Sequence, residues 1–539
     1  MATTTQEFMQ QLRSKATELF IREEWNDSIK TYSQFINLCT HHLSLPHSSP
    51  LHLQKLRKSL CISFCNRAEA KSRLRDFNSA LQDCDHALQI DATHFKTLVC
   101  KGKVLLSLNR YSMALHCFKT ALLDPQANGN CEFIDGYFEK CKKFEFLSRT
   151  GSLDLSDWVL NGFSAKAPEL AEFIGAVEIR KSEISGRGIF VTKNIDAGSL
   201  ILVTKAIAME RSILAGKDLS EDTQLVMWKN FVDKVVDFTR KCHKTRNLIC
   251  KLSIGENEDS LEVPDVDIFR PESVVEVNSS EDIDVDIDID MVRLLAILDV
   301  NSLTEDAVSA NVLRKNHDCY GVGLWLLPSF INHSCCPNAR RLHVGDYLIV
   351  HASRDLKAGE EITFAYLDPL SPLNKRKEMS VTWGIHCKCK RCKFEGEILL
   401  SKQEVKEIEI GIERGTDVGG LVYKLEEMMK RWKIRGKEKG YLRASFWSVY
   451  SEAYGSERCM KRWGRRIPAL DAVADSITDV VGGDLRVLKI LMEELKRKGG
   501  GNSSGLVEME KVFTLAREVY GKVVKKQAMR TLLELCIAD

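Results

Sequence analysis

One stretch of the chain repeats itself every 34 residues, and this period constrains the fold more than any other feature. The recurring positions pair Ala68, Phe77, Ala80, Ala87 and Asp91 with Gly102, Tyr111, Ala114, Ala121 and Pro125. Small residues at three of these positions let two antiparallel helices approach closely, while an aromatic residue fills the gap between repeats. A degenerate earlier copy keeps the same offsets in Ala16, Trp25, Ser28 and Phe35. Since about three repeats bury a continuous core, the pattern predicts a helical solenoid.

The period and its residue pattern resemble tetratricopeptide (TPR) repeats over residues 5–145, so the sequence predicts a TPR domain over residues 1–150. The resemblance implies a groove that binds a peptide or a protein partner, and a structural spacer is the alternative. Asn66, Arg67 and Lys96 are similar to parts of the clamp with which TPR co-chaperones hold a chaperone's C-terminal carboxylate. The other clamp positions depart from the family pattern and hold Arg13, Thr17 and Cys100.

The composition excludes several classes of protein. With 539 residues, of which 44% are hydrophobic, the chain is long enough for about three or four structural units. Lys and Arg (77) nearly balance Asp and Glu (75), so no direct nucleic-acid binding is expected. No apolar stretch approaches the roughly 18 residues that span a bilayer, and Met1 to Lys15 lacks the apolar core of a signal peptide. The sequence therefore predicts a soluble protein of the nucleus, the cytoplasm or both, without membrane contact, whose 18 cysteines are reduced.

Beyond Leu170 the hydrophobic pattern changes from helical to alternating, which predicts short strands. A hairpin is expected at Val344-Gly345-Asp346, where glycine supplies a positive φ. Four motifs occur in this part of the chain. They are Gly186-Arg187-Gly188, then Asn332-His333-Ser334-Cys335, then Glu360 to Tyr366 with the tyrosine at a strand end, and then Cys387-x-Cys389-x2-Cys392.

In this order and spacing, the four motifs resemble those of SET-domain protein-lysine methyltransferases over about residues 173–210 and 311–398. The similarity is greatest to the SET-and-MYND subgroup and its TPR-bearing relatives. It implies transfer of the sulfonium methyl group of S-adenosyl-L-methionine to a lysine ε-amine. Such a transfer is an in-line displacement that depends on alignment and desolvation, so no pair of acid and base side chains is required.

The resemblance also assigns roles to individual residues. The cofactor-binding positions are Gly186, Arg187, Gly188, Asn316, Asn332 and His333. Tyr366 is the catalytic position, where a hydroxyl orients the amine of the substrate lysine. Trp383 stands where relatives commonly have a second channel tyrosine, and Ile385 stands where relatives often have an aromatic residue. Trp383 can still line a substrate channel and offer a cation–π face.

Three closely spaced cysteines, Cys387, Cys389 and Cys392, leave one position open in a tetrahedral zinc site. The resemblance implies that Cys335 completes this site, so that a Zn²⁺ ion holds the post-SET segment against the cofactor site. Redox chemistry by a cysteine pair is the alternative. Basic neighbours favour thiolates under either hypothesis, and they are Lys388, Lys390, Arg391 and Lys393.

The expected architecture is a multidomain α+β protein with an N-terminal α-solenoid, a central β-rich SET domain with a zinc-binding post-SET segment, and a C-terminal helical region. The expected boundaries are 1–150 for the TPR repeats, 151–210 for the first part of the SET domain, 211–310 for an insertion, 311–398 for the SET core and post-SET segment, and 399–539 for the helical region. Gly255 to Asp290 carries 14 acidic residues against one basic residue, which predicts a flexible, solvated loop. The insertion offers only Cys242, His243 and Cys250 as ligands, too few for a MYND zinc finger.

The leading hypothesis is a protein-lysine N-methyltransferase that uses S-adenosyl-L-methionine and Zn²⁺. Its TPR array would recruit a protein substrate, with a histone or a non-histone lysine as the methyl acceptor. The alternative is a catalytically inactive SET and TPR scaffold or a co-chaperone-like interaction protein.

Overall fold

The structure is a computed structural model of the 539-residue chain. It describes residues 2–43, 50–124, 131–164, 166–213, 221–255, 261–273, 290–305, 308, 319–382, 384–401, 403–414, 417–497 and 503–537. These residues form two compact units. One unit holds the first 150 residues together with Lys234–Leu248 and the described residues from Asp267 to Ser273, and the other unit holds the rest. No helix among the described residues is long and apolar enough to cross a bilayer.

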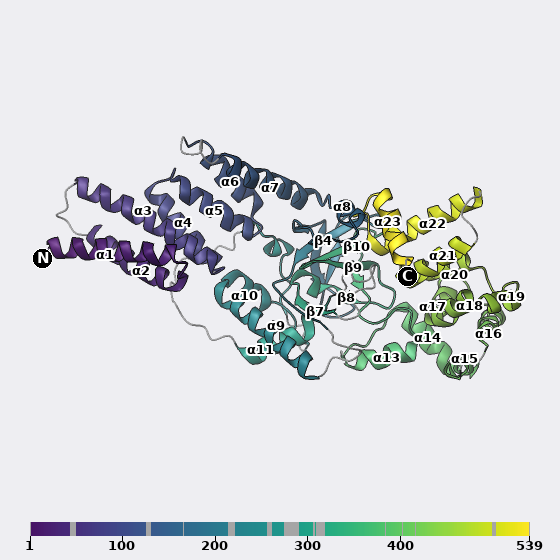
Figure 1. Ribbon diagram of the computed structural model, residues 1–539. Helices are drawn as coiled ribbons and strands as arrows, with labels where there is room; N and C mark the ends of the chain where they lie inside the picture. The colour runs from purple at the N-terminus through teal and green to yellow at the C-terminus, as the bar shows by residue number, and fades with distance from the viewer. Residues whose placement is uncertain are drawn as a thin grey trace. The chain divides into compact units, whose positions relative to one another are not determined.

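The N-terminal unit is built from paired helices (Figure 1). They are α1 (Ala2–Ile21), α2 (Trp25–Leu43), α3 (Pro50–Arg73), α4 (Phe77–Ile90), α5 (Phe95–Ser107), α6 (Tyr111–Ala121) and α7 (Cys131–Thr150). Small residues at the repeat positions account for the close pairing. A Cβ atom at Gly102 would lie 2.7 Å from the ring of Phe118, and Ala68 at the equivalent position is fully buried. The helical solenoid expected from the 34-residue period is confirmed.

Polar contacts between neighbouring helices add to this packing. Arg67 on α3 donates to both carboxylate oxygens of Asp83 on α4, at 2.8 and 2.6 Å, and to Ser33 Oγ on α2 at 2.8 Å. Asp83 is 2% exposed, and a buried carboxylate is stable only with such partners. Asn66 donates to the hydroxyl of Tyr32 at 2.9 Å. Asn66 and Arg67, which are similar to clamp residues, therefore hold α2, α3 and α4 together.

Part of the insertion contacts the N-terminal helices. It contains the part of α9 (Glu221–Lys241) from Lys234 onward, and α10 (His243–Ile249). Asn78 in the first turn of α4 donates to the carbonyl oxygen of Lys241, at 3.4 Å. Lys244 on α10 donates to the carbonyl oxygens of Arg270 and Ser273, at 2.8 and 3.0 Å, and so holds the chain that follows the short 3-10 helix η3 (Val266–Phe269).

This segment also caps α6 of the N-terminal unit. The Glu272 carboxylate accepts a hydrogen bond from the backbone N–H of Ser112 at 2.9 Å, and Arg110 donates to the carbonyl oxygen of Pro271 at 3.1 Å. The first turn of a helix has N–H groups without helical partners, and these attract a carboxylate. The described part of the acidic stretch therefore differs from the solvated loop that its composition predicts. The low-complexity run from Asp282 to Asp288 lies outside the described residues.

The centre of the second unit is a set of small sheets. The strands are β1 (Phe173–Ile174), β2 (Val177–Lys181), β3 (Arg187–Val191), β4 (Leu200–Lys205), β5 (Ala208–Ile213), β6 (Leu303–Thr304), β7 (Cys319–Leu324), β8 (Asn332–His333), β9 (Ala339–Val344), β10 (Tyr347–Ala352) and β11 (Thr363–Phe364). The largest sheet has the order β1-β4-β10-β9, beside a three-stranded sheet β5-β7-β6 and the pairs β2-β3 and β8-β11. β9 and β10 form the expected hairpin, with Tyr347 opposite Val344 and with Gly345 at a φ of +56°.

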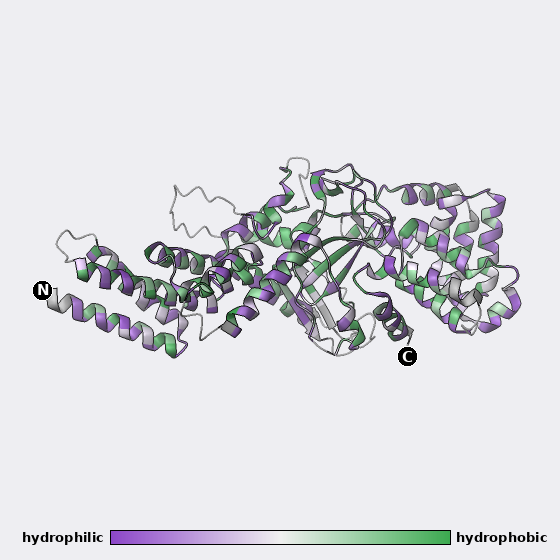
Figure 2. Ribbon diagram, turned by 90° about the horizontal axis from the view of Figure 1, so that it is seen from above, coloured by the Kyte–Doolittle hydropathy of each residue, from purple (hydrophilic) through white to green (hydrophobic). Residues whose placement is uncertain are grey.

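Helices surround these sheets. They are α8 (Ser156–Leu160), α11 (Met291–Asn301), the 3-10 helix η4 (Leu327–Phe330), α13 (Leu373–Thr382), α14 (Lys390–Ser401), α15 (Gln403–Glu413), α16 (Val418–Arg431), α17 (Gly436–Ser445), α18 (Trp447–Gly455), α19 (Glu457–Trp463), α20 (Leu470–Val481), α21 (Leu485–Arg497), α22 (Ser503–Tyr520) and α23 (Lys526–Ile537). Figure 2 shows hydrophobic strands at the centre and helices that carry both hydrophobic and hydrophilic residues. One hydrophobic core joins Val344 and Ile349 of the sheet with Tyr450, Val481 and Leu532 of the C-terminal helices.

A buried polar cluster lies where the large sheet meets these helices. His351 at the end of β10 is fully buried, and its Nε2 lies 3.0 Å from the carbonyl oxygen of Glu518 on α22. Loss of hydration lowers the pKa of His351 to about 4. Glu518 Oε2 is buried and has no hydrogen-bond partner in the part of the chain that the structure describes. Burial therefore raises the pKa of the Glu518 carboxyl from 4.5 to about 7, although Arg340 acts in the opposite direction.

Replacing Glu518 by glutamine is expected to stabilise the protein above neutral pH. The pKa of Glu518 is higher in the folded chain than in the unfolded chain, so protonation of this carboxyl stabilises the fold. This contribution is fully present below pH 4.5 and is lost as the pH rises through about 7. The shift corresponds to roughly 3 kcal/mol at pH 8. Glu518→Gln should therefore match the wild type near pH 4 and have the higher free energy of unfolding at pH 8, measured by chemical denaturation of the full chain.

Glu510 provides the matched control, because it lies on the same helix and its side chain is 60% exposed. The difference between Glu510→Gln and the wild type should not depend on pH. If the difference in the free energy of unfolding between Glu518→Gln and the wild type also stays constant between pH 5 and pH 8, the pKa of Glu518 is not raised.

Candidate functional site

A short parallel strand pair brings two distant motifs together. β8 pairs with β11 so that Asn332 lies opposite Thr363 and His333 lies opposite Phe364. Tyr366 follows β11 by two residues, and its ring centroid lies 5.5 Å from that of His333. The second and third sequence motifs therefore meet at one place.

The side chain of Asn332 holds the glycine turn of the first motif against this strand pair. Its amide nitrogen donates to the carbonyl oxygens of Ser185 and Arg187, both at 3.1 Å. Gly186 has a φ of +47°, which favours glycine. The turn therefore leaves its backbone uncovered at Gly186, where a small-molecule ligand can approach without meeting a Cβ atom.

Glu361 closes the other side of the turn, and the sequence analysis assigned no role to it. Its carboxylate accepts from Ser182 Oγ at 2.8 Å and from Asn332 Nδ2 at 2.7 Å. A Cβ atom at Gly188 would collide with this carboxylate, so a larger residue there would displace Glu361 from its partners. Asn338 Nδ2 donates to the carbonyl oxygen of Glu361 at 2.8 Å. Glu361 and Asn338 lie inside or beside the sequence motifs, but their partners come from distant segments.

Arg187 contributes to the turn through its backbone, whereas its side chain points into the insertion. The guanidinium is buried and donates to the carbonyl oxygens of Lys251 and Glu262, at 2.8 and 3.1 Å. It also lies 5.0 Å above the ring of Phe330. The side chain therefore fixes the insertion to the SET core, and only the backbone of Arg187 is available for a cofactor.

Tyr366 has its hydroxyl turned inward and part of its ring open to solvent. The hydroxyl donates to the carbonyl oxygen of Ile331 at 2.5 Å, and the residue is 40% exposed. Burial of the phenol raises its pKa to about 12. At neutral pH the hydroxyl is therefore protonated, with its donor engaged by Ile331 and its lone pairs available to a second group.

Four cysteines from two distant segments form a compact cluster. The sulfur atoms of Cys335, Cys387, Cys389 and Cys392 all lie within 4.8 Å of one another, and Sγ of Cys335 is 3.5 Å from Sγ of Cys392. A tetrahedral zinc site with bonds of about 2.3 Å has sulfur atoms about 3.8 Å apart, so the cluster fits Zn²⁺. A hydrogen bond from Cys335 is the chief cause that lowers the pKa of Cys387, whereas hydrogen bonds to the other three cysteines raise the pKa of Cys335. Cys336 lies next to Cys389 but is not one of the four.

A buried arginine attaches this cluster to the rest of the second unit. Arg391 on α14 is fully buried and donates to the carbonyl oxygens of Cys335 and Pro369, at 3.2 and 2.6 Å, and to Ser445 Oγ at 2.8 Å. The sequence analysis placed Arg391 in a run of basic residues around the cysteines. The structure buries Arg391, whereas Lys388 and Lys390 of that run are exposed.

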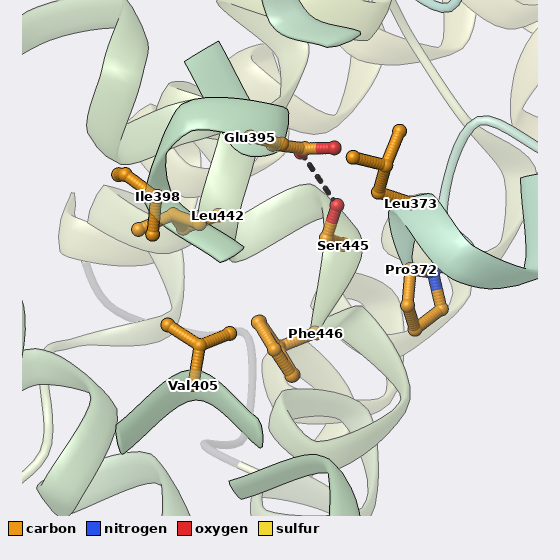
Figure 3. Close-up of a pocket in the computed structure, with 8 residues that line it drawn as sticks. All are labelled: Pro372, Leu373, Glu395, Ile398, Val405, Leu442, Ser445 and Phe446. Atoms are coloured by element: carbon orange, nitrogen blue, oxygen red, sulfur yellow. Dashed lines mark hydrogen bonds between the residues drawn. The ribbon is translucent and has the colours of Figure 1, made fainter. Parts of the chain in front are cut away.

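Glu395 forms ion pairs with this arginine and with a second one. Its carboxylate accepts from Arg391 Nε at 2.9 Å and from Ser445 Oγ at 2.6 Å, and it forms an ion pair with the buried Arg376 of α13. Figure 3 shows Glu395 and Ser445, joined by their hydrogen bond, beside a small hollow with an otherwise apolar lining of Pro372, Leu373, Ile398, Val405, Leu442 and Phe446. None of these lining residues belongs to the four motifs, so the hollow is a feature of helix packing rather than of the site.

Two of the residues that the resemblance singles out are not placed. Asn316 and Trp383 lie outside the described residues, and their roles stay predictions. Ile385 is described, and its backbone N–H donates to the carbonyl oxygen of Ser380 at 3.0 Å.

Comparison with known proteins identifies the central region. Residues 186–367 match the SET domain family. A methyltransferase of Gibberella zeae is 27% identical over 351 residues, which is 61% of this chain and 46% of that protein. Human histone-lysine N-methyltransferase SMYD3 is 33% identical over 118 residues, which is 21% of this chain and 25% of that protein. The matched part thus spans less than half the length of these relatives.

Part of the chain also resembles solved structures. The TPR2B domain of yeast Sti1, in a complex with pHsp70, is 19% identical and covers 25% of this chain and 96% of that chain, with a TM-score of 0.21. The assignment of the repeats depends on the 34-residue period and on the packing of α1 to α7. The chain therefore carries a SET domain at residues 186–367, and methyltransferases such as SMYD3 are among its homologues.

Proposed function

We propose that this protein is an S-adenosyl-L-methionine-dependent protein-lysine N-methyltransferase. The observation that carries the proposal is the convergence of three distant segments. Asn332 holds the glycine turn at residues 186–188, and the strand pair of β8 with β11 sets Tyr366 beside His333. The homology of this region to methyltransferases supports the same reaction.

The cofactor, when bound, supplies a methyl group on a sulfonium, which needs no further activation by the protein. The backbone of Gly186, Arg187 and Gly188 would hold it, together with Asn332 and His333, and Asn316 is proposed as a further contact. The chain fits such a ligand because Gly186 leaves the turn open and because the Nδ2 bonds of Asn332 leave its Oδ1 to accept from a ligand. Glu361 keeps Asn332 in this orientation through its bond at 2.7 Å.

Tyr366 would orient the substrate amine rather than remove its proton. A phenol with a pKa of about 12 is a hydroxyl at neutral pH, so it is not the base. Its hydrogen is donated to Ile331, and a lone pair can accept from the amine N–H and so direct the nitrogen lone pair. A free lysine amine has a pKa of about 10.4 and loses its proton more readily where burial disfavours the charged form. Trp383 is proposed as a wall of the channel that provides this dry environment.

The other parts would serve the same reaction. The four cysteines would bind one Zn²⁺ and keep the post-SET segment in place, and the buried Arg391 and Glu395 attach α14 to the C-terminal helices. The TPR array would recruit a protein substrate, with a histone or a non-histone lysine as the acceptor, in the nucleus, the cytoplasm or both. A bound peptide or protein partner in the TPR groove is part of the same proposal.

Replacing Tyr366 by phenylalanine tests the catalytic assignment. The variant loses the hydroxyl that orients the amine but keeps the ring, so kcat should fall by about 10²-fold while the affinity for the cofactor stays within about twofold. The measurement is transfer of radiolabelled methyl groups from S-adenosyl-L-methionine to proteins of a cell extract, together with calorimetric titration of the cofactor.

Tyr423→Phe is the matched control, since Tyr423 lies on α16 and packs near Trp463, outside the site. It should transfer methyl groups like the wild type. Equal turnover in Tyr366→Phe would refute the assignment. Binding of the cofactor by the wild type without any labelled protein would favour the inactive scaffold instead.

Removing the metal tests the cysteine cluster. The purified protein should contain one zinc per chain, and Cys392→Ser should lose most of it, because a four-ligand site with three thiolates binds zinc far more weakly. The loss should also lower the melting temperature and methyl transfer, measured by atomic emission, scanning calorimetry and the labelling assay.

Cys250→Ser serves as the control, because Cys250 is an exposed cysteine of the insertion. It should keep the full zinc content. A wild-type protein that holds no zinc and instead has a disulfide within the cluster would support the redox alternative.

A further inference from the structure

We infer that Arg486 is a positioning residue through which the C-terminal helices hold the segment that follows Tyr366. Only the kinetic part of its test rests on the proposed methyl transfer. Arg486 lies in the first turn of α21, and its guanidinium donates to both carboxylate oxygens of Asp368, at 3.0 and 2.6 Å. Asp368 follows Tyr366 by two residues, so this ion pair joins α21 to the segment that carries the proposed catalytic hydroxyl.

Tyr366 lies between two anchored parts of the chain. On one side β11 ends at Phe364, and its ladder with β8 does not include Tyr366. On the other side the Asp368 carboxylate accepts from the backbone N–H of Leu370 at 3.0 Å and from the hydroxyl of Ser371 at 2.8 Å, which forms a tight turn. One extended residue spans at most about 3.6 Å, so a turn two residues away limits where the backbone of Tyr366 can lie.

Asp484 fixes the orientation of the Arg486 guanidinium. Asp484 directly precedes α21 and is 5% exposed. Its carboxylate accepts from Nε and Nη2 of Arg486, both at 3.1 Å, and from the backbone N–H of Arg486 at 2.9 Å. The guanidinium therefore lies between two carboxylates and makes two hydrogen bonds to each. A planar fork of N–H donors can do this, whereas the single ammonium of a lysine cannot.

Charges of opposite sign alternate along this cluster. Arg340 on β9 lies 3.6 Å from Oδ2 of Asp484, so two arginines balance two aspartates. Burial alone would raise the pKa of the Asp368 carboxyl, but the hydrogen bonds and the charge of Arg486 lower it to about 2. Asp368 is therefore ionised at neutral pH. Since Nη2 of Arg486 donates to both aspartates, loss of the guanidinium would leave two like charges close together, and their repulsion would displace the turn.

Three substitutions in the full chain test the ion pair from both sides. Arg486→Gln removes the charge and the fork, and Arg486→Lys keeps the charge alone. Asp368→Asn removes the charge but keeps an oxygen for the N–H of Leu370. The two side chains are 48% and 33% exposed, so the variants should fold. The measurements are kcat and KM for methyl transfer, hydrogen–deuterium exchange of the Tyr366 and Leu370 amides, and the melting temperature.

Arg354→Gln is the matched control. Arg354 pairs with Glu360 at 3.0 Å, and their side chains are 46% and 35% exposed, close to the values for the first pair. Both residues lie between β10 and β11, so this pair does not connect the segment to a C-terminal helix. Arg354→Gln should have the kcat and the amide exchange of the wild type.

Arg486→Gln should lower kcat about tenfold, change KM for the cofactor by less than about twofold, and speed exchange of the Tyr366 and Leu370 amides about tenfold. Arg486→Lys should lie between Arg486→Gln and the wild type in both kcat and exchange. Asp368→Asn should change both quantities in the same direction as Arg486→Gln. The double variant should be no worse than Arg486→Gln, because both substitutions remove the same contact.

Wild-type kcat and exchange in a folded Arg486→Gln protein would overturn the inference. A double variant whose loss of kcat is the product of the two single losses would also overturn it, and so would equal losses in Arg354→Gln. If Arg486→Gln does not fold, Asp368→Asn decides the question by the same measurements. A wild type that transfers no methyl groups would refute the proposed function alone, because amide exchange still decides the role of Arg486.

Discussion

The site depends on the short parallel pairing of β8 with β11. In this pairing Asn332 lies opposite Thr363 and His333 lies opposite Phe364. The ladder is extended by one bond, from the N–H of Ser334 to the carbonyl oxygen of Phe364 at 2.8 Å. Asn332 of this pair binds the glycine turn, while Cys335 follows β8 by two residues and Tyr366 follows β11 by two residues. The hairpin of β9 and β10 lies between these two strands in sequence and belongs to the largest sheet.

Much of the fold and part of the site could be predicted from the sequence. The other features depend on contacts that only the folded chain forms. The 34-residue period predicted the paired N-terminal helices because each repeat position has the same packing role, and Gly345 predicted its hairpin because a local turn needs a positive φ. The four cysteines could be brought together only through the family resemblance, since Cys335 is far from the triad in sequence. Glu361 could not be given a role, because its partners Ser182 and Asn332 come from separate segments. The composition wrongly predicted a solvated loop for the described part of the acidic stretch. The Glu272 carboxylate accepts a hydrogen bond at the start of α6, a position that only the folded chain brings near it.

Buried charge surrounds the cysteine cluster. Arg376 and Arg391 together carry two positive charges and Glu395 carries one negative charge, while all three side chains are at most 2% exposed. Among the described residues, Nε and Nη1 of Arg376 have no hydrogen-bond partner, and its charge acts on Cys335. A buried net positive charge is stable only beside negative groups, and a zinc ion with four thiolates carries two negative charges. The same arginines that join α13 and α14 to the C-terminal helices therefore also favour ionised sulfur.

The order of strands in the largest sheet has a consequence for synthesis of the chain on the ribosome. β4 lies between β1 and β10, and the segment that separates β4 from β10 is roughly 140 residues long. At about 5 to 20 residues per second, β4 waits roughly 7 to 28 s with one edge unpaired after it has been made. The N-terminal helices α1 to α7 precede β4 and contact mainly their neighbours in sequence, so they can fold in advance. During that interval an already folded array is joined to a half-made sheet whose free edge is open to chaperones and to other nascent chains.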